Sequence, residues 1–289
     1  MNNDKIIPKS LEIELTWACN ENCIHCYLKH SKPPIVMVDE TISNLLEEIK
    51  NYKIERILLT GGEVFLNPNL FEVIEKIDSP DLNLKIFSNL TICSKEDMNR
   101  LKDYNIRLIQ TSLYSMNPET HDYITGVRGS FQKTLSAIKY LDNIGIKVEV
   151  SYPLLTLNYK NVFNVIKYSD SLNIKTGVDF FIHGEIGEKK SNLNYRLNHN
   201  QLRELYELNK REYSDYLYLW GEQTMMKSAN TSEINFFNSQ SLSIKPDGTV
   251  TPMIGIDIEL GNINNNSLVD IANSEKALML NKITMNDFK

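Results

Sequence analysis

The sequence predicts an α/β fold: an open, partial (βα)6 barrel of the TIM type, followed by a small hairpin and helix appendage. Short apolar runs alternate with longer segments whose apolar residues recur every three or four positions. This pattern is typical of strands that are covered on both faces and alternate with amphipathic helices. Such alternation indicates a parallel sheet with right-handed crossovers, and six units are too few to close an eight-stranded barrel.

The six predicted strands are compact apolar runs. They cover Leu11–Thr16, Arg56–Thr60, Leu84–Ser88, Leu108–Ser112, Lys147–Ser151 and Thr176–Phe180. The five predicted helices between them cover Asp39–Asn51, Leu70–Asp78, Ser94–Tyr104, Ser130–Ile144 and Asn161–Leu172. In barrels of this kind the chemistry lies at the C-terminal ends of the strands, so we expect functional residues directly after each strand.

The pattern changes after about residue 184. Gly184–Leu197 is polar and predicts a loop or lid. Beyond it we expect a helix, a hairpin around a Pro-Asp-Gly turn and a short terminal helix, at His199–Tyr213, Leu242–Pro252 and Leu268–Asn281. We therefore divide the chain into a main domain at about residues 1–197 and a C-terminal appendage at residues 198–289.

Composition narrows the class of protein. The chain has 289 residues, 42% hydrophobic and 24% charged, which excludes a disordered or collagen-like chain. A formal net charge of -6 makes nucleic acid an improbable partner. No run reaches the roughly 18–20 apolar residues of a membrane helix, and Met1–Lys9 lacks the apolar core of a signal peptide. We expect a cytoplasmic protein without a membrane partner, whose four cysteines serve as metal ligands or catalytic thiols.

Three of the four cysteines lie within eight residues, directly after the first predicted strand. In Cys19-x3-Cys23-x2-Cys26, three thiolates can converge from one loop on one metal centre. A four-iron cubane needs a ligand on each iron, so three cysteines would leave one iron open to a substrate. Structural zinc is the alternative, with His25 or His30 as the fourth ligand. A complete four-cysteine cluster that uses the distant fourth cysteine is a weaker alternative.

Three motifs together resemble the radical S-adenosylmethionine (radical SAM) enzymes. The cysteines match the family signature CxxxCxΦC, with His25 at the usually aromatic position Φ. Thr60–Glu63 reads Thr-Gly-Gly-Glu after the second strand, as the GGE segment of the family does. A third match runs from Gln110–Tyr114 through Pro118–Asp122 to Gly126–Phe131. The resemblance covers about residues 10–180.

The resemblance implies one [4Fe-4S] cluster held by Cys19, Cys23 and Cys26, with S-adenosylmethionine chelating the fourth iron. An electron from the reduced cluster then cleaves the sulfonium, and a 5′-deoxyadenosyl radical abstracts hydrogen from the substrate. The cofactor supplies the difficult chemistry, and the protein supplies position, charge and exclusion of water.

The same resemblance implies a set of cofactor contacts. Gly61 and Gly62 lack a Cβ and let the backbone pass close to a ligand, while Glu63 accepts from the methionine ammonium. Ser88 and Asn89 are candidates for the ribose hydroxyls. Ser112 and Arg128 are candidates for the methionine carboxylate, and His25 or Tyr27 for the adenine or the cluster. Each position has a structural alternative: a Gly-Gly turn, a polar strand end or a surface charge.

The isolated cysteine, Cys93, follows the third predicted strand. A buried free cysteine is usually a packing residue. The functional alternative is a hydrogen-atom donor that quenches a substrate radical, as radical peptide epimerases require.

The segment from Leu242 to Met253, with Leu260–Ile263 after it, resembles the SPASM/twitch appendage of radical enzymes that modify peptides. In that appendage, cysteines hold auxiliary iron–sulfur clusters. Here Met253 stands where a cysteine is expected, Asn235 is near an earlier cysteine position, and no cysteine follows Cys93. A thioether is a weaker ligand than a thiolate, so we expect the hairpin scaffold without an auxiliary cluster.

The sequence leaves two classes of substrate as alternatives, a peptide and a small metabolite. The appendage favours a ribosomally synthesised peptide, and a small metabolite such as a sugar or nucleoside is the alternative; a noncatalytic iron–sulfur or zinc module is the third hypothesis. We expect a low-potential electron donor such as flavodoxin or ferredoxin. Because Cys19 lies early in the chain, a separate leader-peptide-binding protein would deliver a peptide. The aromatic residues Tyr213, Tyr216, Tyr218 and Trp220 could line a peptide groove, although packing is their more common role.

Overall fold

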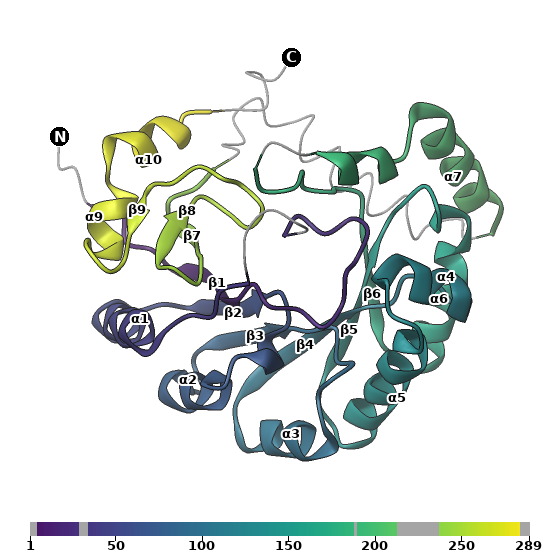
Figure 1. The fold of residues 1–289 in the computed structure, drawn as a ribbon, viewed down its shortest axis with the longest axis horizontal. Helices are drawn as coiled ribbons and strands as arrows, with labels where there is room; N and C mark the ends of the chain where they lie inside the picture. Colours follow the sequence, from purple (N-terminus) through teal and green to yellow (C-terminus); the bar gives the residue numbers. More distant parts are fainter. Residues whose placement is uncertain (1–4, 29–33, 188–189, 213–236, 284–289) are drawn as a thin grey trace.

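Six parallel strands, each followed by helical segments, form the main body of the computed structural model, which describes residues 5–28, 34–187, 190–212 and 237–283. The strands are β1 (Ser10–Thr16), β2 (Arg56–Gly61), β3 (Asn83–Phe87), β4 (Ile106–Ser112), β5 (Val148–Pro153) and β6 (Lys175–Asp179). The helices are α1 (Asp39–Asn51), α2 (Leu70–Ile77), α3 (Lys95–Arg100), α4 (Pro118–Thr125), α5 (Ser130–Asn143), α6 (Val162–Ser171) and α7 (His199–Glu212). Figure 1 shows the helices around the outside of the strands. The predicted partial barrel is confirmed.

The sheet stays open. Its strand order is β6-β5-β4-β3-β2-β1-β7-β8-β9, and every pair from β6 to β1 is parallel. The C-terminal ends of these six strands therefore lie along the same edge. Between β1 and β2 the register shifts at Glu14/Thr16, immediately before the cysteine segment.

The C-terminal hairpin is part of the same sheet. It consists of β7 (Ser241–Ile244) and β8 (Thr249–Thr251), with β9 (Gly261–Asn262) paired to β8. β7 pairs with β1 in parallel, from Ser10↔Ser241 to Ile13↔Ile244. In Figure 1 the hairpin lies directly beside β1. The strand that leads into the cysteines is thus flanked by β2 on one side and by the hairpin on the other.

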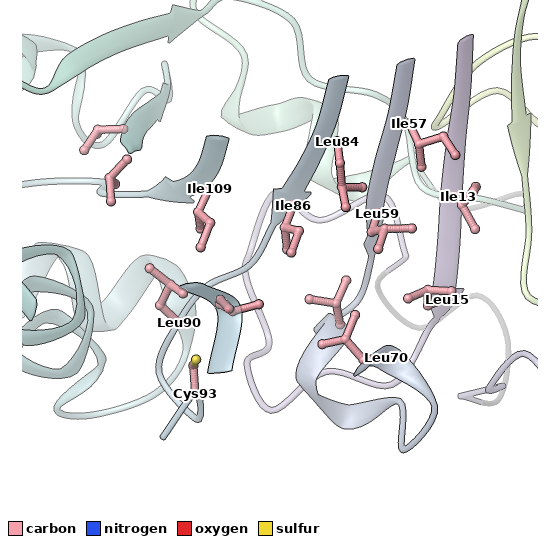
Figure 2. Close-up of a cluster of buried hydrophobic side chains, with 14 of the residues drawn as sticks. Ile13, Leu15, Ile57, Leu59, Leu70, Leu84, Ile86, Leu90, Cys93 and Ile109 are labelled. Atoms are coloured by element: carbon pink, nitrogen blue, oxygen red, sulfur yellow. The ribbon is translucent and has the colours of Figure 1, made fainter. Parts of the chain in front are cut away.

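The core lies between the sheet and the outer helices. Alternate strand residues such as Leu11, Ile13, Ile57 and Ile86 are buried there, and Figure 2 shows this layer against the helix that begins at Leu70. The opposite face of the strands points into the barrel and is largely polar. On β1 it carries two glutamates and a threonine, and this polar face leads to the strand ends.

The terminal helix and the segment after β4 differ most from the prediction. The terminal helix is divided into α9 (Leu268–Ala272) and α10 (Glu275–Leu280), because Ser274 adopts extended backbone and its Oγ accepts from Ala277 N, starting a new helix. α4 was not predicted as a helix; Asn117 caps it and Pro118 begins it. The aromatic residues Tyr213, Tyr216, Tyr218 and Trp220, and Asn235, lie outside the described residues. Within the described residues, no helix has the length and apolar character to cross a bilayer.

Candidate active site

A cavity of about 490 Å³ opens at the C-terminal ends of the strands. We call it the central cavity. Its walls come from the ends of β2 to β6 and from residues 17–28, the cysteine loop. Its volume is in the range of pockets that hold a cofactor-sized ligand, and its position is where barrels of this type place their chemistry.

The cysteine loop brings all three clustered cysteines to this cavity. Cys19, Cys23 and Cys26 each line it. The loop is fixed to the end of α4, because Asn22 N donates to Thr125 O (2.9 Å) and Ile24 N donates to Ile124 O (3.0 Å).

The turn that follows α4 makes this attachment possible. Gly126 has φ +70°, and a Cβ at this position would lie 3.0 Å from the backbone oxygen of Asn22. A glycine therefore lets the cysteine loop and the helix end approach each other.

The surroundings of the thiols fit a positively charged metal centre. Desolvation raises the pKa of Cys19 to about 12. Burial also raises the pKa of Cys23, and the neighbouring carboxylate of Glu21 raises it further. Metal ligation requires thiolates, and a bound cation would favour the deprotonated form of these sulfurs.

Hydrogen-bond donors are directed at two of the sulfurs. Glu21 N lies 3.4 Å and Asn89 Nδ2 3.7 Å from Cys19 Sγ, while Tyr114 Oη lies 3.9 Å from Cys23 Sγ. Donors of this kind stabilise charge on cluster sulfurs and tune the reduction potential.

Structural zinc is the alternative centre for these cysteines. Within the part of the chain that the structure describes, no three His, Cys, Asp or Glu side chains gather as one metal ion would require. A single tetrahedral ion needs its ligands about one point, whereas a cubane spreads its three thiolates over separate irons. His30 lies outside the described residues.

The glycine pair after β2 supports the cysteine loop. A Cβ at Gly61 would lie 2.1 Å from Thr16 O, and one at Gly62 would lie 2.2 Å from Ala18 O. Two backbone hydrogen bonds cross this contact, from Gly62 N to Thr16 O (2.7 Å) and from Glu63 N to Ala18 O (2.8 Å). Both glycines also line the central cavity. Glycine is thus required at these two positions for the close approach of β2 to the start of the cysteine loop, in addition to any approach to a ligand.

Glu63 has a different place from the one that sequence analysis gave it. Its carboxylate is fully buried and is not among the groups that line the central cavity. It accepts from Ser88 Oγ (2.8 Å), Asn89 N (2.8 Å) and Phe65 N (3.2 Å). Burial raises the pKa of Glu63, and these hydrogen bonds oppose the rise. In this structure Glu63 orients Ser88 and Asn89, which do line the cavity.

Ser112, His25 and Tyr27 also line the central cavity. Ser112 ends β4, while His25 packs edge-on against Tyr114 with ring centroids 5.2 Å apart. The hydroxyl of Tyr27 donates to Glu14 Oε1 inside the barrel, and burial raises the pKa of Tyr27 well above its usual range.

Arg128 is not brought to the cavity. It is exposed in the turn before α5 and does not line the central cavity. Asp122 fixes this turn, because its carboxylate accepts from Gly129 N (2.5 Å) and Phe131 N (2.9 Å). Burial would raise the pKa of Asp122, but these hydrogen bonds outweigh it and the pKa is lowered.

Cys93 also lies away from the cavity. It is 8% exposed and belongs to the hydrophobic core, where Figure 2 shows it near Leu90. Its thiol lies 3.8 Å from Ser94 O, and burial raises its pKa far above the usual value. This position favours the packing interpretation of Cys93.

Sequence analysis missed the part of the cavity wall that follows β6. Asp179, Phe181 and His183 line it at and after the end of β6. Phe181 is 70% exposed, and its backbone N donates to Asp179 Oδ1 (2.9 Å). Burial raises the pKa of Asp179 and lowers that of His183. The position of Asp179 at a strand end was the signal that could have identified this group.

The predicted loop or lid lies against the cysteine loop. Ile186 N donates to Tyr27 O (2.8 Å), and Asn192 Nδ2 donates to His25 O (3.1 Å). Within this segment, residues Ser191–Tyr195 form a 3-10 turn. The loop therefore covers the cysteine loop on the side of β6.

Comparison with known families gives two matches. The family model of the Radical SAM superfamily matches residues 13–169. The SPASM model, described as an iron–sulfur cluster-binding domain, matches residues 236–288.

Two curated relatives come from Bacillus subtilis. The antilisterial bacteriocin subtilosin biosynthesis protein AlbA is 30% identical over 175 residues, which are 60% of this chain and 39% of AlbA. The sporulation killing factor maturation protein SkfB is 26% identical over 285 residues, which are 96% of this chain and 68% of SkfB. The chain thus spans about two fifths to two thirds of these relatives.

Solved structures share the fold. The anSMEcpe structure with bound AdoMet has a TM-score of 0.74 at 18% identity, covering 96% of this chain and 84% of that one. Streptococcus suis SuiB bound to precursor peptide SuiA has a TM-score of 0.72 at 15% identity, covering 94% and 66% respectively. At these identities the likeness concerns the fold alone.

Proposed function

Because this chain belongs to the radical SAM superfamily, we propose that it is a radical S-adenosylmethionine enzyme that abstracts hydrogen from a ribosomally synthesised peptide. The observation that carries the proposal is the central cavity, where Cys19, Cys23 and Cys26 face the ends of β2 to β6. A bound [4Fe-4S] cluster would supply the electron that cleaves S-adenosylmethionine to methionine and a 5′-deoxyadenosyl radical, which takes one hydrogen atom from the substrate to become 5′-deoxyadenosine.

In this proposal the chain positions the cofactors. The three cysteines would each bind one iron of the cluster, and the backbone of Gly61 and Gly62 would approach the methionine end of S-adenosylmethionine. Ser88 and Asn89, held by buried Glu63, offer hydrogen bonds to the ribose hydroxyls, and Ser112 offers one to the methionine carboxylate. These roles are supported by the position of each residue on the cavity wall.

A peptide substrate is supported by two observations. The curated relatives AlbA and SkfB are named for biosynthesis and maturation of peptide products. The cavity wall after β6 joins an exposed aromatic ring, Phe181, to a carboxylate and an imidazole, Asp179 and His183. Apolar contact beside groups that accept and donate hydrogen bonds suits a peptide with both backbone amides and apolar side chains.

We propose that this chain binds one cluster. The matched SPASM region contains no cysteine, because Cys93 is the last in the sequence. Met253 offers only a thioether, a poor iron ligand beside a thiolate. The division of the chain at residue 197, between the barrel and the appendage, is likewise a proposal, as is reduction of the cluster by flavodoxin or ferredoxin.

The test is reductive cleavage of S-adenosylmethionine by anaerobically reconstituted protein. We expect about four irons per chain and formation of 5′-deoxyadenosine with dithionite. The triple variant C19A/C23A/C26A should lose both, whereas C93A should keep both because Cys93 lies in the core. A colourless zinc protein, or equal activity in the triple variant, would contradict the proposal.

Substrate class needs a second measurement. Candidate peptides encoded beside the gene are incubated with the enzyme and examined by mass spectrometry. A mass change in one peptide, dependent on S-adenosylmethionine, supports the peptide proposal. Cleavage that is stimulated by a sugar or nucleoside and by no peptide would favour the small-metabolite alternative.

A further inference from the structure

The C-terminal hairpin pairs with the strand that leads into the cysteine loop, and it contains no cysteine of its own. β7 pairs with β1 as far as Ile13↔Ile244. The next residue of each strand is charged, Glu14 on β1 and Lys245 after β7. Both are buried, with 2% and 5% exposure respectively. Two opposite charges are therefore enclosed where the hairpin meets the strand that leads into the cysteines.

Glu14 fixes the two ends of the cysteine loop. Trp17 Nε1 donates to Glu14 Oε2 (2.8 Å), and the hydroxyl of Tyr27 donates to Glu14 Oε1. Trp17 comes two residues before Cys19, and Tyr27 directly follows Cys26. One carboxylate thus joins the beginning and the end of the segment that carries all three cysteines. Because each oxygen accepts a hydrogen bond, the contacts fit the ionised carboxylate.

An ionised carboxylate at this depth needs a compensating cation. Lys245 donates from Nζ to Asp257 Oδ1 (2.7 Å), so its ammonium is held in place from the hairpin side. Burial raises the pKa of Glu14, and the hydrogen bonds from Tyr27 and Trp17 together with the charge of Lys245 oppose this rise. A second link lies alongside, because Ile254 N donates to Glu12 Oε2 (3.0 Å). Removing Lys245 is expected to be costly, because the buried charge of Glu14 is then left with less compensation.

We propose that Lys245 and Glu14 form a brace that lets the hairpin hold the cysteine loop without a metal centre of its own. Lys245 compensates Glu14, and Glu14 holds Trp17 and Tyr27 at the two ends of the loop. Both charged residues are positioning residues, since neither lines the central cavity. The appendage, matched by a cluster-binding family model, thus acts here through the charge of a buried lysine beside Glu14.

The brace can be tested on the protein without iron, by the rate at which iodoacetamide alkylates each cysteine. The peptides that carry Cys26 and Cys93 are resolved by mass spectrometry. We expect K245M to speed alkylation of Cys26 about tenfold, which corresponds to about 1.4 kcal/mol of lost local stability. Cys93, in the core behind the sheet, should not change.

Three further variants separate charge from packing. E14Q can still accept from Trp17 and donate to Tyr27 Oη, so its effect should be mild. K245M/E14Q should return towards the wild-type rate, because the buried charge is gone and the carboxylate of Asp257, with 47% side-chain exposure, stays solvated. K245R should rescue, because it restores the cation. K276M is the matched control, since Lys276 is an exposed lysine on the same appendage.

Two results would overturn the brace: an unchanged Cys26 rate in K245M, or a double variant that is worse than K245M. If K245M does not fold, recovery of folded protein in K245M/E14Q supports the proposal and failure of both contradicts it. Because these measurements use the iron-free protein, they do not depend on the proposed enzymatic activity.

Discussion

Substitution of Gly62 by alanine tests how the cysteine loop is supported. The new Cβ would meet Ala18 O at 2.2 Å, Ala18 C at 2.7 Å and Trp17 O at 2.9 Å. All three are backbone atoms, and contacts under 3.0 Å are not tolerated, so the strand end and the loop must separate by about 1 Å. That shift strains or breaks the hydrogen bonds from Gly62 N to Thr16 O and from Glu63 N to Ala18 O, each of which contributes about 1 kcal/mol.

The expected result is a folded but damaged site. We expect G62A to lose about 2 kcal/mol in the free energy of unfolding. Displacement of catalytic groups by about 1 Å lowers rates by roughly 100-fold, so formation of 5′-deoxyadenosine should fall to about 1%.

The assays are thermal unfolding, iron content after reconstitution and the rate of 5′-deoxyadenosine formation. The matched control is G145A. Gly145 has φ +81° and no atom within 4 Å of a new Cβ, so the variant pays backbone strain of about 1 kcal/mol without touching the site. Wild-type iron content and activity in G62A would refute the reasoning.

Three further predictions concern side chains around the site. E63Q places an amide donor opposite a backbone N–H, such as that of Asn89, where the wild-type carboxylate accepts. We expect it to lower the free energy of unfolding by about 1–3 kcal/mol and to raise the KM for S-adenosylmethionine. An unchanged KM would contradict the positioning role of Glu63. Y114F removes the hydroxyl that lies near Cys23 Sγ. In the proposed cluster this hydroxyl stabilises the reduced state, which is more negative. The midpoint potential in an EPR titration should therefore fall by about 40 mV, equivalent to about 1 kcal/mol, and an equal or higher potential would argue against the contact. Burial lowers the pKa of His121 from 6.5 to about 4, so the folded state resists protonation of this imidazole. The free energy of unfolding should therefore fall by about 3 kcal/mol as the pH falls from 6.5 towards 4. H121F should flatten this pH dependence in chemical denaturation, and an unchanged dependence of the free energy of unfolding on pH would refute the assignment.

The sequence was sufficient to predict the barrel and its reactive edge. Buried strands show as apolar runs, so β1 and β2 were located to within a residue or two. Since Cys19 and Gly61 follow or end neighbouring parallel strands, their meeting at one edge followed from topology alone.

Side-chain direction could not be predicted from the motifs. Glu63 and Arg128 stand in matching motif positions, yet one is buried behind the cavity wall and the other is exposed in a turn. Both orientations depend on long-range contacts, such as that of Glu63 with Ser88 on the neighbouring strand.

The buried charges of the brace were also hidden in the sequence. Leu-Glu-Ile-Glu-Leu in β1 alternates as a strand with one solvent-facing side does. In an open barrel with a polar interior, the glutamates of this pattern face inward instead. Nothing local to Lys245 indicates that Glu14 lies beside it, because their pairing depends on a hairpin that joins the sheet more than 200 residues later.

The most direct test is EPR spectroscopy of the reduced, anaerobically prepared protein with and without S-adenosylmethionine. A cluster bound by Cys19, Cys23 and Cys26 has one iron free of protein ligands, so the signal of the reduced cluster should change shape and g-values when S-adenosylmethionine binds. A cluster signal that ignores S-adenosylmethionine, or an EPR-silent protein that contains zinc, would contradict the account.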